Sequence, residues 1–149
     1  YYERVLNEIG FNTNKVDNYS VEPNADVHEL ILNSDVFCAL QSSTVIESSI
    51  SGKPVIVPVF ENYKSTKNYK DFIWRGHMEL FDVADNKQHL KELIIDLMDH
   101  PYVDNNILDR RKKVFKSFFN DLDGVSLNHY VNIITNVATD GKNIKHNVN

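Results

Sequence analysis

Apolar and polar positions alternate in blocks along the chain, and the first blocks predict two helices around a short strand. Residues 1–9 are rich in helix formers and stop at a glycine, so we expect a helix that ends there. A β-prone piece at 18–23, closed by a proline, predicts a strand. Residues 24–34 have the apolar spacing of a helix, with Asn24 or Asp26 as its capping residue.

Two continuous apolar runs flank a short helical segment in the middle of the sequence. The runs "DVFCAL" at 35–40 and "KPVIVPVF" at 53–60 are bounded by polar residues, which is the pattern of strands buried on both faces. Between them, "STVIESSIS" predicts a helix that ends at Gly52. Strand, helix and strand in this order form a βαβ unit, so we expect a parallel sheet.

The second half of the chain predicts one more strand and a helical end. Residues 61–72 are polar and lack a clear period, which indicates a surface loop, and 78–84 offers a third strand. Residues 86–101 carry apolar side chains at spacings of three and four, the pattern of an amphipathic helix. Two further helices are expected near 105–120 and 126–138.

The alternation of these elements predicts an α/β fold: a Rossmann-like parallel sheet flanked by helices, with a helical C-terminal region. The 149 residues suffice for one core, so we expect a single domain at 1–138 and a frayed polar tail at 139–149. The chain opens "YYERVLNEIG" without a methionine or a signal segment, and we expect it to be a fragment of a larger protein.

Composition and charge place the chain among globular proteins and away from nucleic-acid binders. It is 42% hydrophobic and 25% charged. No apolar run is long enough for a transmembrane segment. The net charge of -5 comes with no long basic run, so we expect no nucleic-acid partner. The most basic piece, "DRRKKVFKSFF" at 109–119, is interpreted as the solvated face of an amphipathic helix.

Cysteine and histidine usage excludes several kinds of site. Cys38 is the single cysteine and lies in an apolar run, so we expect a small core residue, no disulfide framework and a reducing cytoplasm. The six histidines have no metal-ligand spacing, and we predict neither a metal site nor a cofactor. No Gly-x-Ser-x-Gly motif or other convincing nucleophile is present, so the catalytic residues stay unknown.

The candidate chemistry lies in "QSSTVIESSISGKPVI" at 41–56, where the first apolar strand leads into a helix. Backbone N–H groups at such a junction bind phosphate, and the hydroxyls of Ser42, Ser43 and Thr44 add donors. Glu47 follows one helical turn after Thr44 and is placed to accept the two hydroxyls of a ribose. The alternative is purely structural: Ser43 caps the helix and Glu47 completes a capping box.

This stretch resembles the donor-binding segment of GT-B fold glycosyltransferases and of the related UDP-N-acetylglucosamine 2-epimerases. Those enzymes have a strand, a Ser/Gly/Thr-rich turn, a helix with a ribose-binding Glu, then Gly-Lys-Pro or Gly-Xaa-Pro and the next strand. Thr44, Glu47 and Gly52 stand at the spacings of that pattern. The resemblance implies that Ser42, Ser43 and Thr44 meet the diphosphate of a nucleotide sugar and that Glu47 holds its ribose.

The extent of the resemblance favours a transferase over an epimerase. It covers roughly 18–137, with the specific motif at 42–54, and the turn lacks the Gly-Gly pair of the epimerases. Capsular and surface-polysaccharide transferases look closer because of their Ser-Ser-Thr turn. The resemblance thus implies the later part of a GT-B C-terminal domain, with an N-terminal acceptor domain missing from this sequence.

A second candidate group is "WRGHMELF", in which Arg75 and His77 flank a glycine. A cation and an imidazole near a diphosphate would neutralise the charge that develops on a leaving nucleotide. The alternative is that Trp74 anchors this segment in the core and His77 is structural. The segment with Tyr63 and Tyr69 would lie near the cleft in the resembling enzymes.

The expected function is therefore the nucleotide-sugar-binding part of a glycosyltransferase that moves a sugar from a nucleotide diphosphate donor to an acceptor hydroxyl in surface polysaccharide synthesis. Two alternatives stay open: an epimerase-like enzyme, and a non-catalytic nucleotide-binding or interaction module. We expect a cytoplasmic location, with contact to the inner face of the membrane through the rest of the chain.

Overall fold

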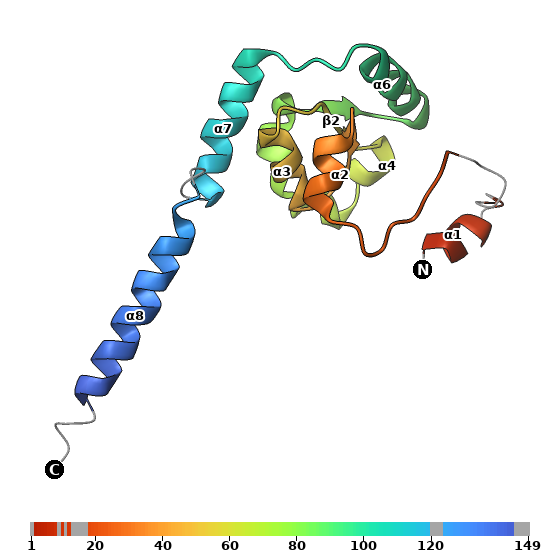
Figure 1. Cartoon of the computed structure of the whole chain (residues 1–149). Coiled ribbons are helices and arrows are strands. Elements are labelled where there is room, and N and C mark those ends of the chain that lie inside the picture. The colour runs from red at the N-terminus through yellow and green to blue at the C-terminus, as the bar shows by residue number, and fades with distance from the viewer. Residues whose placement is uncertain (1, 9, 11, 13–17, 120–123, 145–149) are drawn as a thin grey trace.

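The computed structural model describes residues 2–8, 10, 12, 18–119 and 124–144. Within these residues the chain is a mixed α/β protein of nine helices and a three-stranded sheet (Figure 1). The first helix, α1 (Tyr2–Glu8), agrees with the predicted N-terminal helix.

The sheet is parallel, as the βαβ pattern predicted. Its strands are β1 (Phe37–Cys38), β2 (Val55–Pro58) and β3 (Asp82–Ala84), in the order β1-β2-β3. Helix α3 (Thr44–Ile50) connects β1 to β2. The longer connection from β2 to β3 holds α4 (Glu61–Lys64), α5 (Lys67–Lys70) and the 3-10 helix η2 (Ile73–Leu80).

The two strands predicted to be buried on both faces differ in the structure. In β2, Val55, Ile56 and Val57 are all inaccessible to solvent, because the strand is central and helices cover both of its faces. The same prediction is wrong for β1, which pairs with β2 alone and is only two residues long. Cys38 is exposed on this edge strand, so its predicted place in the core is wrong as well.

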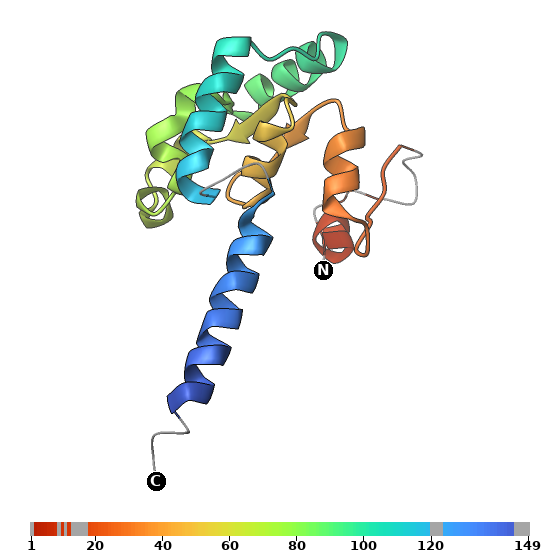
Figure 2. The same ribbon diagram turned by 60° about the vertical axis from the view of Figure 1, so that its left-hand side comes forward.

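The core lies on both faces of the sheet, and the alternation along β2 divides it. Val55 and Val57 face a cluster shared with α3, η2 and α7 (Asn105–Phe119), which includes Trp74 and Phe115. Ile56 faces the other side, where α6 (Lys87–Asp99) packs. Figure 2 shows α7 crossing one face while α6 lies over the other. The result is a layered arrangement of helix, parallel sheet and helix.

Two of the helices begin at capping side chains, of which only the first was predicted. Asp26 caps α2 (Val27–Asn33), since its Oδ1 accepts the backbone N–H of His28 at 2.8 Å. Of the two predicted caps, Asp26 is therefore the one used. Asn86 caps α6 in the same way, accepting the N–H of His89 at 2.9 Å, and the predicted helix at 86–101 is confirmed with slightly tighter bounds.

Three predicted elements differ from the structure. The piece at 18–23 forms no strand, because a β-prone run needs a neighbouring strand and β1 has only β2 beside it. The predicted loop at 61–72 contains the short helices α4 and α5. The predicted strand at 78–84 is confirmed only for Asp82–Ala84, since the preceding residues form the end of η2.

The C-terminal helix α8 (Ser126–Ile144) extends away from the sheet and its covering helices (Figures 1 and 2). It continues past the end predicted from the sequence, so the expectation of a frayed tail is wrong for 139–144. The remainder of that predicted tail, 145–149, lies outside the described residues. None of the helices that the structure describes is both long and apolar enough to cross a bilayer.

Candidate functional site

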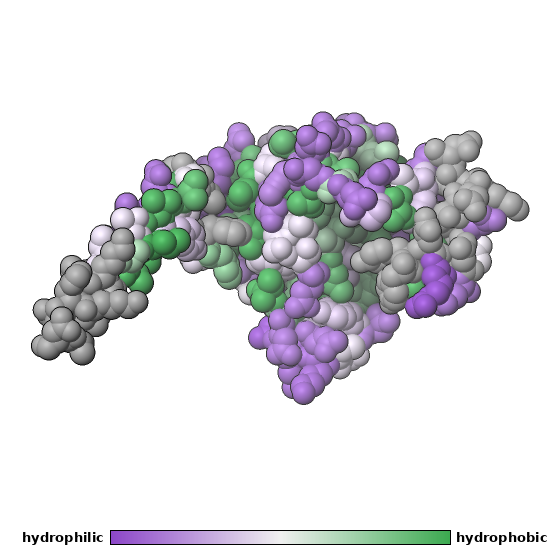
Figure 3. Space-filling model, turned by 60° about the horizontal axis from the view of Figure 1, so that its bottom comes forward, coloured by the Kyte–Doolittle hydropathy of each residue, from purple (hydrophilic) through white to green (hydrophobic). Residues whose placement is uncertain are grey.

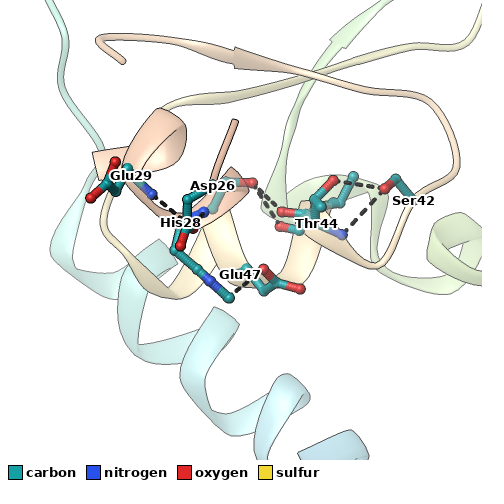
Figure 4. Close-up of polar contacts among 8 residues, drawn as sticks. Asp26, His28, Glu29, Ser42, Thr44 and Glu47 are labelled. Atoms are coloured by element: carbon teal, nitrogen blue, oxygen red, sulfur yellow. Dashed lines mark hydrogen bonds and ion pairs between the residues drawn. The ribbon is translucent and has the colours of Figure 1, made fainter. Parts of the chain in front are cut away.

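The predicted phosphate-binding turn, Ser42–Thr44, begins four residues after the end of β1 and is called the hydroxyl turn below. The hydroxyl oxygens of Ser42 and Thr44 are 2.7 Å apart, and the backbone N–H of Thr44 donates to the Ser42 hydroxyl at 3.3 Å. Figure 4 shows these two side chains pointing toward each other at the start of α3. The turn therefore presents a small group of hydroxyls that are linked to one another and only half-buried.

The predicted capping box of Ser43 and Glu47 is wrong. Ser43 precedes the first residue of α3, but its φ of -60° and ψ of -29° are helical, and its hydroxyl makes no capping hydrogen bond. A capping hydroxyl needs an extended backbone to reach the N–H groups two and three residues ahead. Glu47 is the fourth residue of α3, one position too far along for the reciprocal bond. The hydroxyl turn is thus not explained as an ordinary capping box.

The serines later in α3 have a structural role. Ser48 and Ser49 are fully buried, and their hydroxyls donate to the carbonyls of Thr44 and Val45 at 2.6 and 2.5 Å. Small side chains that satisfy their own hydroxyls let α3 pack closely against α7. The hydroxyl-rich stretch therefore divides into an exposed turn and a buried helix face.

An open hollow lies at the carboxyl edge of the sheet, beside the hydroxyl turn. It has a volume of about 470 Å³ and is lined by Leu40, Gln41, Tyr63, Asn68 and Asp71. Leu40 and Gln41 follow β1, whereas the other three residues belong to the connection that follows β2. Ligands of open parallel sheets bind outside the carboxyl ends of the strands, and this carboxyl-edge hollow is in that place.

The outer wall of the carboxyl-edge hollow is stiffened by an aromatic trio. The ring of Tyr63 meets Tyr69 and Phe72 edge-on, with centroids 5.9 and 6.2 Å away, and Tyr69 stacks on Phe72 at 6.1 Å. Phe72 is buried, so it fixes the trio to the core. Because of this packing, the segment expected to be a plain loop presents Tyr63 in a defined position.

Helix α4 is also tied to the end of β3 by a lysine. The Nζ of Lys64 is 2.8 Å from Oδ1 of Asp85 and 2.8 Å from Oε1 of Glu61. The hydrogen bond and charge of Lys64 lower the pKa of Asp85 below its ordinary value, and the two carboxylates raise the pKa of Lys64. These pairs are exposed, so they orient α4 more than they stabilise it.

Glu47 turns toward α2 instead of toward the carboxyl-edge hollow. Its Oε2 is 3.4 Å from Nε2 of His28, and Figure 4 shows the two side chains facing each other across α2 and α3. The pair borders an apolar groove of about 250 Å³ that also involves Ile31, Leu32 and Ile50. The Oε2 atom is buried and accepts no hydrogen bond, so this carboxylate has acceptor capacity to spare.

Arg75 and His77 lie on η2, where Arg75 is exposed and His77 occupies a kink with φ of -138°. Across the described residues, no hydrogen bond or ion pair joins either side chain to the hydroxyl turn. Trp74, the residue before Arg75 on η2, is fully buried. The centroids of the Phe81, Phe115 and Phe118 rings lie within 6.3 Å of its own ring centroid. The structural alternative for Trp74 is therefore confirmed, while a role for Arg75 and His77 stays a prediction.

The amino edge of the sheet is held by a buried arginine that the sequence interpretation missed, and this residue also lines a hollow of about 220 Å³ there. Arg111 on α7 is 1% exposed, and its guanidinium donates to the carbonyls of Leu80 at 2.8 Å and Lys53 at 3.1 Å. It also lies over the ring of Phe81 at 5.8 Å. The expectation of a solvated basic face is wrong for this residue, although neighbouring Arg110 is exposed.

A signal for Arg111 was present in the sequence. Arg111, Val114, Phe115 and Phe118 follow each other at spacings that place them on one helix face, so the arginine shares the apolar stripe. No such signal existed for the residues that complete the site. His28, Asn68 and Asp71 gain their place only through the tertiary arrangement of α2 and α5.

Comparisons with known proteins add no relative: no family model, no curated protein and no solved structure matches the chain. In the described part of the chain, no group of three or more His, Cys, Asp or Glu side chains is arranged to hold a metal ion. Fold and site together define a layered α/β protein with a hydroxyl turn and an open hollow at the carboxyl edge of a parallel sheet.

Proposed function

We propose that this chain is the nucleotide-sugar-binding part of a GT-B type glycosyltransferase of surface polysaccharide synthesis. The observation that carries the proposal is the hydroxyl turn beside an open hollow at the carboxyl edge of the sheet. In the proposed reaction, a sugar passes from a nucleotide diphosphate to an acceptor hydroxyl, and the acceptor is bound by another domain.

The strand order supports a Rossmann-like arrangement. In a doubly wound sheet, each half is built from strands that follow one another in space in the order of the sequence. The parallel order β1-β2-β3 fits one such half. Under this proposal β1 is the strand next to the topological switch point, where nucleotides bind, and the hydroxyl turn lies in the connection between β1 and α3.

The chemistry of the turn fits a diphosphate. Helix α3 is only about two turns long, so its dipole contributes little, and the hydroxyls with the nearby backbone N–H groups are the main donors. Ser42, Ser43 and Thr44 would donate to the phosphate oxygens, at the expense of the bond between Ser42 and Thr44. The three side chains of the turn itself are uncharged, so they do not repel a dianion.

The remaining recognition is divided between two neighbouring surfaces. Glu47 lies one turn beyond Thr44, and to accept the two hydroxyls of a ribose its carboxylate would have to turn away from His28, because its Oε2 is buried beside that residue. In the carboxyl-edge hollow, Tyr63 offers a ring face while Asn68 and Asp71 offer polar groups for a base or sugar. Arg75 and His77 are the candidate cations for the departing diphosphate, and they would have to approach from η2.

Thermal unfolding in the presence of UDP, CDP or GDP tests the proposal. One of them should raise the melting temperature of the chain by about 5–10 °C at a concentration of about 100 times its Kd. Thr44→Val and Glu47→Ala should remove most of that rise, whereas Asp109→Ala, an exposed carboxylate on α7, should keep it. Absence of a shift with all three nucleotides would rule out nucleotide binding by this part of the protein.

A further inference from the structure

Helix α8 carries a row of large apolar side chains that nothing in the described structure covers. The six side chains are between 52% and 69% exposed, and they are Leu127, Tyr130, Val131, Ile133, Ile134 and Val137. We call them the α8 stripe. Figure 3 shows apolar surface along this helix, which Figures 1 and 2 show extending away from the rest of the molecule. Monomeric proteins rarely leave a contiguous apolar surface of this kind in water.

The spacing within the α8 stripe is that of a helix-pairing seam. Leu127, Tyr130, Ile134 and Val137 follow each other at intervals of three, four and three residues, which is the alternation of a heptad repeat. Val131 and Ile133 lie on the two sides of this seam and widen it. The opposite face is uniformly polar and consists of Asn128, His129, Asn132, Thr135, Asn136 and Thr139.

The charge of α8 selects among possible occupants of the stripe. Residues 125–139 contain no Asp, Glu, Lys or Arg. Helices that lie on anionic membranes carry Lys and Arg along their polar face, and α8 has none over 125–139, the part that bears the stripe; Asp140 and Lys142 follow beyond it. In coiled coils that choose between partners, the positions on either side of the heptad seam carry charged side chains. In α8 these positions are the apolar Val131 and Ile133. Two identical helices can therefore lie side by side without like-charge repulsion.

The area of the stripe is at the lower end of what a dimer needs. If each of its six side chains lost all of the about 100 Å² that it exposes on average, two paired helices would bury at most about 1,200 Å², the lower bound for a stable interface. We propose that α8 is a homodimerisation helix, whose stripe packs against the stripe of a second copy of this chain. The dimer would be of moderate affinity, since its area is at that lower bound.

Analytical ultracentrifugation of paired variants tests the proposal. The unmodified chain should sediment as a dimer at about 100 µM, a concentration above the Kd expected for an interface of this size. The double variant Tyr130→Asp/Ile134→Asp should weaken the dimer by at least about 100-fold, because it places charges inside an apolar interface. The matched control Asn132→Asp/Thr139→Asp adds the same two residues to the polar face and should stay dimeric.

The control also separates loss of pairing from loss of the helix. Both double variants introduce two aspartates into the interior of α8, so their helix propensity falls equally and circular dichroism can verify the remaining helix. A chain that sediments as a monomer at about 100 µM overturns the proposal, as does equal weakening of the dimer in both variants. Sedimentation with phosphatidylcholine or phosphatidylglycerol vesicles, abolished by Tyr130→Asp/Ile134→Asp, would overturn it in favour of a lipid surface.

Discussion

The two edges of the three-stranded sheet are built in opposite ways. At the amino edge, Arg111 is buried and its guanidinium joins the backbone ahead of β2 to the backbone ahead of β3. At the carboxyl edge, the hydroxyls of Ser42 and Thr44 bond mainly to each other and border an open hollow. The amino edge is held by a long-range contact from Arg111, which also lines a hollow of about 220 Å³ there, whereas the carboxyl edge is held by local contacts beside a hollow of about 470 Å³.

The two kinds of contact should differ in how much the free energy of unfolding falls when they are removed. A buried side chain that satisfies distant carbonyls is costly to remove, because the carbonyls are then left without a donor. Local, half-exposed hydroxyl bonds are exchanged for bonds to water or to a ligand at little cost. We therefore expect substitutions at the amino edge to unfold the protein and those at the carboxyl edge to affect ligand binding.

The largest effect is expected for Arg111→Met. The substitution removes the donors to the Leu80 and Lys53 carbonyls, and the free energy of unfolding should fall by about 3 kcal/mol. Relief from burying a charge offsets part of the loss, since burial already lowers the pKa of Arg111. Urea unfolding followed by circular dichroism measures the change.

The neighbouring residue provides a matched control for this prediction. Arg110 is exposed and pairs with Glu79 at 2.6 Å on the surface, so Arg110→Met should cost less than about 1 kcal/mol. If both substitutions destabilise the protein equally, the amino edge is not held by the buried guanidinium, and the comparison between the two edges fails.

The sequence predicted the central strand of the sheet better than the edge strand β1. The parallel βαβ unit and the central strand β2 followed from local apolar runs, because burial on both faces leaves a continuous pattern. β1 has a similar run but is an edge strand, and no local pattern shows how many neighbours a strand has. The same limit explains Cys38, whose exposure depends on that missing neighbour.

The candidate site was predictable to a similar extent. The hydroxyl turn follows from its position after an apolar strand, and the structure places it at the carboxyl edge as expected. The partner of Glu47 could not be predicted, because His28 reaches it only through the packing of α2 on α3. Tyr63 and Asn68 of the carboxyl-edge hollow lie on α4 and α5, helices of four residues that are too short to form on their own and that no apolar period announces.

A second prediction concerns two carboxylates at the opposite ends of β3. Burial raises the pKa of Asp82 above its ordinary value of 3.8, although Arg111 partly opposes the shift. The contribution of Asp82 to stability is therefore present at low pH and is lost as the pH rises through its raised pKa. The hydrogen bond from Lys64 lowers the pKa of Asp85, whose contribution is present above pH 3.8 and is lost as the pH falls.

Carboxyl carbon NMR across the acidic range should show Asp85 releasing its proton first and Asp82 later as the pH rises. Lys64→Met removes the hydrogen bond to Asp85 and should return its pKa toward 3.8 without moving that of Asp82. Coincident titration of the two carboxyls in the unmodified chain would contradict the assigned difference between the two ends of the strand.

The smallest effect on stability is expected at the hydroxyl turn. Ser42→Ala removes the 2.7 Å contact with the Thr44 hydroxyl and the acceptor of the Thr44 backbone N–H. Because Ser42 and Thr44 are both half-exposed, the free energy of unfolding should fall by only about 0.5–1 kcal/mol. Ser117→Ala on α7 also removes one local serine bond and serves as the control; because alanine is the better helix former at this exposed position, it should change the free energy of unfolding by less than about 0.5 kcal/mol. The two variants should differ in their response to nucleotide, since only Ser42→Ala should reduce the rise in melting temperature. A loss of stability at Ser42 as large as that at Arg111 would instead make the turn a structural element, and the carboxyl edge would then be no freer to bind a ligand than the amino edge.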